Sequence, residues 1–155
     1  MSTAYALFHG VHLLAAALII GFMAIVQWSV VPSQNELDGP AYARFERRMN
    51  VPLQRLTPAL LLTAIVAGAT TAVLAFAIGS GWAWAHLAVT GALVGMTVST
   101  LIANAPVNRE IDGWDPERLP ANWAPRRSRW EQGHAIRVAM GLPALALAVV
   151  TAVIG

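Results

Sequence analysis

The sequence contains no cysteine and no lysine, and only 12% of its 155 residues are charged. The absence of cysteine excludes disulfides, thiolate nucleophiles and cysteine-ligated metals or clusters. Soluble proteins carry about 25% charged residues, whereas 57% of this chain is apolar. The composition therefore excludes an ordinary soluble domain and indicates an integral membrane protein.

Four apolar runs are long enough to cross a bilayer, which takes about 20 residues in a helix. They cover residues 5–31, 58–78, 82–105 and 134–154. The first run is too long for a signal peptide and has no basic segment before it, so we expect it to be retained as a span. At this length the prediction is one domain, 1–155, of the all-α class: an antiparallel four-helix bundle in the membrane.

The arginines predict how the bundle is oriented. Nine of the ten lie between the first and second runs or between the third and fourth, and Arg137 lies at the adjoining end of the fourth run. The positive-inside rule then places both longer connections in the cytoplasm and both termini outside, as in a multi-pass protein of the inner (cytoplasmic) cell membrane. Residues 40–50 of the first connection fit either an interfacial helix or an extension of the second span.

Histidines gather at the predicted outer end. His9 and His12 share one face of the first span, and His86 lies near the outer end of the third. Three imidazoles at one depth could hold a metal ion or supply axial ligands to a haem, although histidines at a water interface are also common. Polar residues continue along the His86 face of the third span, where threonines could simply bond the carbonyls of their own helix. These residues are Thr90, Thr97, Thr100 and Asn104.

A denser group of polar residues is predicted at the cytoplasmic end. If the fourth helix begins near Asn122, its aromatic and cationic side chains share one face, and Glu131 lies beside that face. The face carries Trp123, Arg126, Arg127, Trp130, His134 and Arg137. Opposite should lie the inner end of the third span. There Pro106 cannot continue the hydrogen-bond ladder, and we expect the backbone to open between Asn104 and Asn108.

These side chains suit a planar aromatic ligand. Imidazole is a common general base near neutral pH, and amide or guanidinium groups can donate hydrogen bonds to a developing oxyanion. Gln27 and Glu46 could reach the same region from the first span and the first connection. The alternative is a belt of tryptophan and arginine that meets lipid phosphates, which would make the protein a non-enzymatic scaffold.

The pattern Asn104-x-Pro106-x-Asn108, followed by Trp123-x-x-Arg126-x-x-x-Trp130-x-x-x-His134-x-x-Arg137, resembles the anthrone oxygenase-like family of small four-span membrane proteins. The span count and the Pro32 that closes the first run also fit, so the resemblance covers nearly the whole chain. Most members have no assigned function. Named members oxidise an anthrone to an anthraquinone with dioxygen, and some relatives have asparagine where His134 stands.

The resemblance implies a membrane-bound, monooxygenase-like enzyme with dioxygen as co-substrate. The predicted catalytic residues are His134, Asn108, Asn104 and Arg137. The predicted substrate-binding residues are Trp130, Trp123, Arg126, Glu131, Glu46 and Gln27. A metal or haem redox protein that uses His9, His12 and His86 is the alternative, and a metal cofactor is left open. The expected partners are the lipid bilayer and a small aromatic molecule, with no nucleic acid; association into a homo-oligomer is left open.

Overall fold

Four long helical rods make up a computed structural model of the chain, which describes residues 3–154. The first rod comprises α1 (Thr3–Ile25), the π-helical turn η1 (Val26–Val30) and α2 (Val31–Asn35), and the second is α3 (Gly39–Ala77). The third comprises α4 (Ala83–Ser99), the π-helical turn η2 (Thr100–Asn104) and α5 (Ala105–Asp112), and the fourth is α6 (Trp123–Ile154). Each rod is long and apolar enough to cross a membrane, and residues 3–154 contain no strand. The predicted all-α fold of four spans is confirmed.

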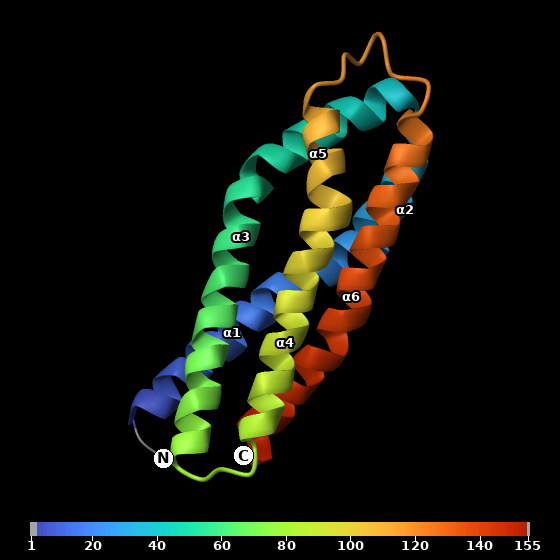
Figure 1. The fold of residues 1–155 in the computed structure, drawn as a ribbon. Coiled ribbons are helices and arrows are strands. Elements are labelled where there is room, and N and C mark those ends of the chain that lie inside the picture. Colours follow the sequence, from blue (N-terminus) through green and yellow to red (C-terminus); the bar gives the residue numbers. More distant parts are fainter. Residues whose placement is uncertain (1–2, 155) are drawn as a thin grey trace.

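The rods alternate in direction. Figure 1 shows the start of α1, the α3–α4 turn and the end of α6 together at one end of the bundle. The connections 36–38 and 113–122 lie at the opposite end, which we call the inner end because the arginine distribution predicts that it faces the cytoplasm. The antiparallel arrangement puts the inner ends of all four rods side by side.

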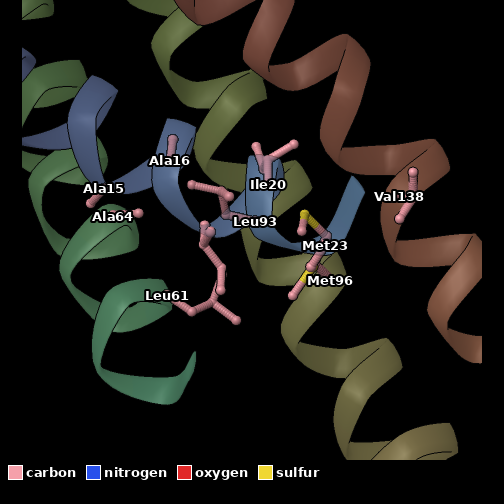
Figure 2. Close-up of a cluster of buried hydrophobic side chains, with 10 residues drawn as sticks. Ala15, Ala16, Ile20, Met23, Leu61, Ala64, Leu93, Met96 and Val138 are labelled. Carbon is pink, nitrogen blue, oxygen red and sulfur yellow. The ribbon is translucent and has the colours of Figure 1, made fainter. Parts of the chain in front are cut away.

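An apolar cluster fills the middle of the bundle. It is built from α1, α3, α4 and α6, and Figure 2 shows its side chains. Alanines occupy much of the α1–α3 contact. Small residues let helix backbones approach closely, which favours association in lipid, where apolar burial alone does not drive it. The buried members are Ala15, Ala16, Ile19, Ile20, Met23, Leu61, Ala64, Leu93, Met96 and Val138.

Residues 40–50 form a helical extension of the second span, because α3 is continuous from Gly39 to Ala77. Asp38 caps its start by accepting a hydrogen bond of 2.8 Å from the Ala41 amide. This cap satisfies one of the free N–H groups of the first turn. Of the two alternatives for this segment, the extension is therefore confirmed.

The third rod does not open at Pro106, so that expectation was wrong. Proline lacks an N–H and its ring clashes with the carbonyl four residues earlier, here that of Ile102. The helix absorbs the mismatch by widening into the π-helical turn η2, after which Pro106 lies in the first turn of α5. The Ile102 carbonyl accepts a long hydrogen bond of 3.5 Å from Arg129 Nη2. The turn η1 likewise precedes Pro32, so both π-helical turns lie toward the inner end.

Candidate functional site

A cavity of about 350 Å³ lies in the inner half of the bundle. This volume is within the range of small-molecule sites, roughly 300–1,000 Å³. All four rods contribute to its wall, and four of the predicted site residues are among those that line it. The lining residues are Phe22, Met23, Val26, Met49, Asn50, Leu53, Gln54, Thr57, Pro58, Thr100, Leu101, Ala105, Asn108, Trp130, His134 and Arg137.

Arg137 brings a positive charge to this cavity. Its side chain is buried, Nη1 donates to Thr100 Oγ1 at 3.2 Å, and Nη2 donates to His134 Nδ1 at 2.8 Å. Within residues 3–154, no carboxylate oxygen lies within 4.0 Å of the guanidinium, and Nε has no hydrogen-bond partner. A buried charge without a counterion is costly. The arrangement therefore suits a ligand that is anionic or becomes anionic at an oxygen atom.

Both ring nitrogens of His134 are engaged. Nδ1 accepts from Arg137 Nη2, and Nε2–H donates to the Met23 carbonyl of α1 at 3.0 Å. A general base needs a free lone pair within reach of the substrate proton. This geometry does not favour the predicted role of His134 as a base, and it favours a role in holding the Arg137 guanidinium against the cavity.

Trp130 forms a rigid wall of the cavity. Its ring stacks on that of His134, with 5.1 Å between centroids and 2° between planes. Trp130 Nε1 donates to Asn108 Oδ1 at 2.7 Å. With its oxygen held by Trp130, Asn108 can offer a ligand the N–H donors of its amide.

Asn104 lies outside the cavity lining and ties the third rod to the fourth. It is buried, and its Nδ2 donates to the Trp130 carbonyl at 2.8 Å. The two rods meet here at Gly133, where an added Cβ would lie 2.6 Å from Ala103 Cβ and 2.7 Å from Asn104 Oδ1. Asn104 thus positions Trp130 through the α6 backbone.

Three further predicted residues lie at the start of α6, outside the cavity. The Trp123 ring has the Arg127 guanidinium 5.2 Å from its centroid. Arg126 forms an ion pair with Glu110 of α5 at 2.9 Å, and Arg127 pairs with Glu131 at 3.6 Å. The Arg126–Glu110 ion pair links the inner end of α6 to α5, whereas these two contacts of Arg127 lie within α6. The structure does not bring Trp123, Arg126 and Glu131 to the cavity wall.

A second polar cluster lies on the buried face of the α3 extension. Tyr42, Glu46 and Asn50 follow one another at intervals of four residues and are all buried. Glu46 Oε1 accepts a hydrogen bond from Gln34 Nε2, whereas Glu46 Oε2, the Tyr42 hydroxyl and Asn50 Nδ2 have no partner among residues 3–154. Asn50 also lines the cavity. Sequence reasoning identified Glu46 but missed Asn50, which the spacing of four residues could have revealed. The buried Oε1 of Gln27 also lacks a partner in the described part of the chain, but Gln27 does not line the cavity.

The three histidines of the outer half are buried between the helices. The rings of His9 and His86 have centroids 4.8 Å apart, and the Tyr5 hydroxyl is hydrogen-bonded to His86 Nε2 at 2.9 Å. His12 Nδ1–H donates to the Ala64 carbonyl at 2.8 Å. No three His, Asp or Glu side chains in residues 3–154 are arranged to hold a metal ion. The metal role of this cluster stays a prediction.

The threonines of the third rod bond within their own helix. Thr90 donates to the His86 carbonyl, Thr97 to that of Leu93 and Thr100 to that of Met96, at 2.8, 3.0 and 2.9 Å. The polar stripe seen in the sequence is therefore explained for these residues by local bonds, which satisfy hydroxyl groups inside a membrane helix. Thr100 alone among them also lines the cavity.

Comparison with known proteins shows the family of this chain. No curated protein and no solved structure matches the chain. The family model described as anthrone oxygenase matches residues 45–151. This segment contains most of α3 and α6 and all of α4 and α5, and it includes Glu46, Asn50, Asn108, His134 and Arg137. Because the matched segment covers most of the chain, the protein belongs to the anthrone oxygenase family.

Proposed function

We propose that this protein is a multi-pass enzyme of the cytoplasmic membrane that oxidises a small, anthrone-like aromatic substrate with dioxygen in the inner cavity. The observation that carries the proposal is the buried Arg137 guanidinium, which lines a cavity of small-molecule size and has no carboxylate partner in the described range 3–154. Family membership supports the reaction class.

The chemistry of an anthrone suits such a cavity. Its ring CH₂ is a weak carbon acid, and loss of a proton gives an enolate with negative charge on oxygen. This electron-rich anion can react with dioxygen directly: the ring carbon becomes a carbonyl, and the second oxygen atom leaves as hydroxide, which takes up the proton lost in the first step and becomes water. Hydrogen-bond donors already aimed at the developing charge lower the barrier to forming the enolate.

The cavity residues divide these tasks. Arg137 and Asn108 would donate to the enolate oxygen, and Trp130 would offer a flat aromatic wall to the fused rings. His134 would hold Arg137 in position, because its Nδ1 already accepts from the guanidinium. An asparagine carbonyl could also accept that bond. We therefore expect His134→Asn to retain more activity than His134→Leu, which has no acceptor.

Turnover by purified protein in lipid nanodiscs tests the proposal. With anthrone as the probe, dioxygen uptake and anthraquinone absorbance would be recorded for the parent and for Arg137→Met, Asn108→Ala and His134→Ala. Losing a donor to an oxyanion costs about 10²–10³-fold in rate, which is the decrease expected for Arg137→Met.

Arg48→Met is the matched control, because Arg48 is an exposed arginine of α3 that does not line the cavity. It should turn over anthrone like the parent. If the folded Arg137, Asn108 and His134 variants also match the parent, the cavity is not the site of the reaction. Size-exclusion chromatography and circular dichroism would establish that each variant is folded.

A further inference from the structure

Proton removal from the substrate needs an acceptor, and the cavity wall does not supply an obvious one. No Asp or Glu is among the residues that line the cavity. Both nitrogens of His134 are hydrogen-bonded, to Arg137 and to the Met23 carbonyl. The acceptor must therefore lie within one relay step of the wall, or the substrate must ionise before it binds.

Glu46 is the carboxyl group that best fits the role of this proton acceptor. It is fully buried, and no arginine or histidine nitrogen in residues 3–154 lies within 4.0 Å of it. Gln34 Nε2 donates to Oε1, which leaves Oε2 without a partner among the residues that the structure describes. A buried carboxylate with a free oxygen and no cation beside it is a good proton acceptor, because protonation removes the cost of burying its charge.

The face of α3 leads from Glu46 to the cavity. Asn50 lies one helical turn further along and lines the cavity, and its buried Nδ2 has no partner within residues 3–154. Tyr42 lies one turn before Glu46, and in the same part of the chain its hydroxyl has no partner either. Buried polar atoms are usually satisfied by protein groups or by ordered water. Three such atoms on one helix face define a polar path that ends at the cavity wall.

We propose that Glu46 accepts the proton that the substrate loses, and that Asn50 connects the carboxylate to the cavity; this inference rests on the proposed function. In this step the C–H bond of the ring CH₂ breaks, and its proton passes through a water molecule hydrogen-bonded to Asn50 onto Glu46 Oε2. The electron pair stays on the substrate as the enolate. Negative charge thereby moves from Glu46 to an oxygen beside Arg137, where a guanidinium stabilises it.

Other charged groups face this cluster from the helices packed against α3. Asp112 of α5 accepts a hydrogen bond of 2.8 Å from Gln54 and acts on Glu46 electrostatically. Arg127 of α6, paired with Glu131, lies 5.7 Å from the centroid of the Tyr42 ring. None of them forms an ion pair with Glu46, so the carboxylate stays available for a proton.

Hydrogen–deuterium exchange without dioxygen isolates the proposed step. Wild-type protein in nanodiscs is mixed anaerobically with anthrone in D₂O, and deuterium at the ring CH₂ is followed by mass spectrometry. General bases contribute about 10²–10⁴-fold. Glu46→Gln should therefore slow the catalysed exchange by at least ~100-fold, and Glu46→Asp should restore part of it.

Two further variants, Asn50→Leu and Glu36→Gln, are measured in the same exchange experiment. Asn50→Leu keeps the carboxyl group but removes the connection, so it should slow exchange as Glu46→Gln does. Glu36 is exposed at the end of α2, and Glu36→Gln should exchange like the wild type. Binding of a hydroxyanthraquinone should be unchanged in Glu46→Gln, whereas a merely structural role would weaken it.

The outcomes separate the inference from the proposed function. Exchange by Glu46→Gln at the wild-type rate, or loss of hydroxyanthraquinone binding together with exchange, overturns the inference. Wild-type protein that oxidises anthrone without accelerating anaerobic exchange also overturns it, and leaves the proposed function standing. Wild-type protein that neither exchanges nor oxidises anthrone overturns the proposed function, and the inference with it.

Discussion

Replacement of Arg137 by methionine should separate the binding of an anion from the binding of an aromatic ring. Methionine keeps much of the side-chain length and removes the charge and every donor. The proposed site should then lose affinity for a ligand with an ionised hydroxyl group and keep its affinity for the methyl ether of the same ligand. A hydroxyanthraquinone and its methyl ether form a suitable pair.

The expected magnitude follows from the bonds in the cavity. A hydrogen bond to a charged group contributes about 1.5–3 kcal/mol, and each 1.4 kcal/mol is tenfold in affinity. Arg137→Met should therefore weaken binding of the ionised hydroxyanthraquinone by about 10- to 150-fold. The methyl ether should bind both proteins within about threefold, because it offers no anionic oxygen.

Stability should not decrease in the same variant. Thr100 loses the Arg137 donor but keeps its own bond to the Met96 carbonyl, whereas His134 Nδ1 loses its donor. An unsatisfied buried acceptor costs about 1–3 kcal/mol. Removing a buried guanidinium without a counterion recovers a desolvation cost of several kcal/mol. We therefore expect the free energy of unfolding to stay the same or to increase.

Titration calorimetry of nanodisc-embedded protein measures both ligands, and unfolding in detergent measures stability. Arg48→Met is the control for the loss of one positive charge from the inner end. The reasoning is refuted if Arg137→Met weakens both ligands equally, or if it leaves the affinity for the ionised ligand unchanged.

Gly133→Ala should destabilise the bundle by about 1–3 kcal/mol, because the new Cβ would lie 2.6 Å from a side-chain carbon of η2. Gly21→Ala is its control: nothing lies within 4 Å of an added Cβ there, and unfolding in detergent should show no loss of stability. Gly68→Ala should also destabilise by about 1–3 kcal/mol, since its Cβ would lie 2.5 Å from Thr90 Oγ1 and 2.6 Å from the His12 ring; a wild-type melting temperature would contradict this packing. Trp130→Phe keeps a flat ring but removes the 2.7 Å bond to Asn108, so it should cost about 1 kcal/mol of unfolding free energy, and Trp130→Phe with wild-type stability would show that this bond contributes nothing.

Much of the fold was predictable because the number and the length of the spans can be read from hydropathy alone. Each span needs about 20 apolar residues, and the four runs supply them. The phase of the fourth helix correctly grouped Trp130, His134 and Arg137 on one face, since positions three and four residues apart lie together on any helix. Their common place in the cavity wall follows from that phase.

Other features could not be read from one helix at a time. Phase showed that His134 and Arg137 are neighbours, but not that the Met23 carbonyl of α1 occupies the second ring nitrogen. It did not show that Asn50 reaches the cavity from α3. The missing N–H of Pro106 predicted an opening of the third span, because such a local rule does not say how a packed helix accommodates a proline.

The sequence by itself determined that the protein lies in a membrane and how many spans it has. It also showed which polar residues would be costly to expose to lipid, because transfer free energies depend on composition and length. Only the tertiary structure decided which of those residues have partners. It joined His134 to two partners and, among the residues described, left Arg137 without a carboxylate and Glu46 Oε2 without a donor. The physical reason is that helical periodicity orients a side chain on its own helix, whereas hydrogen bonds and ion pairs depend on what the neighbouring helices place opposite it.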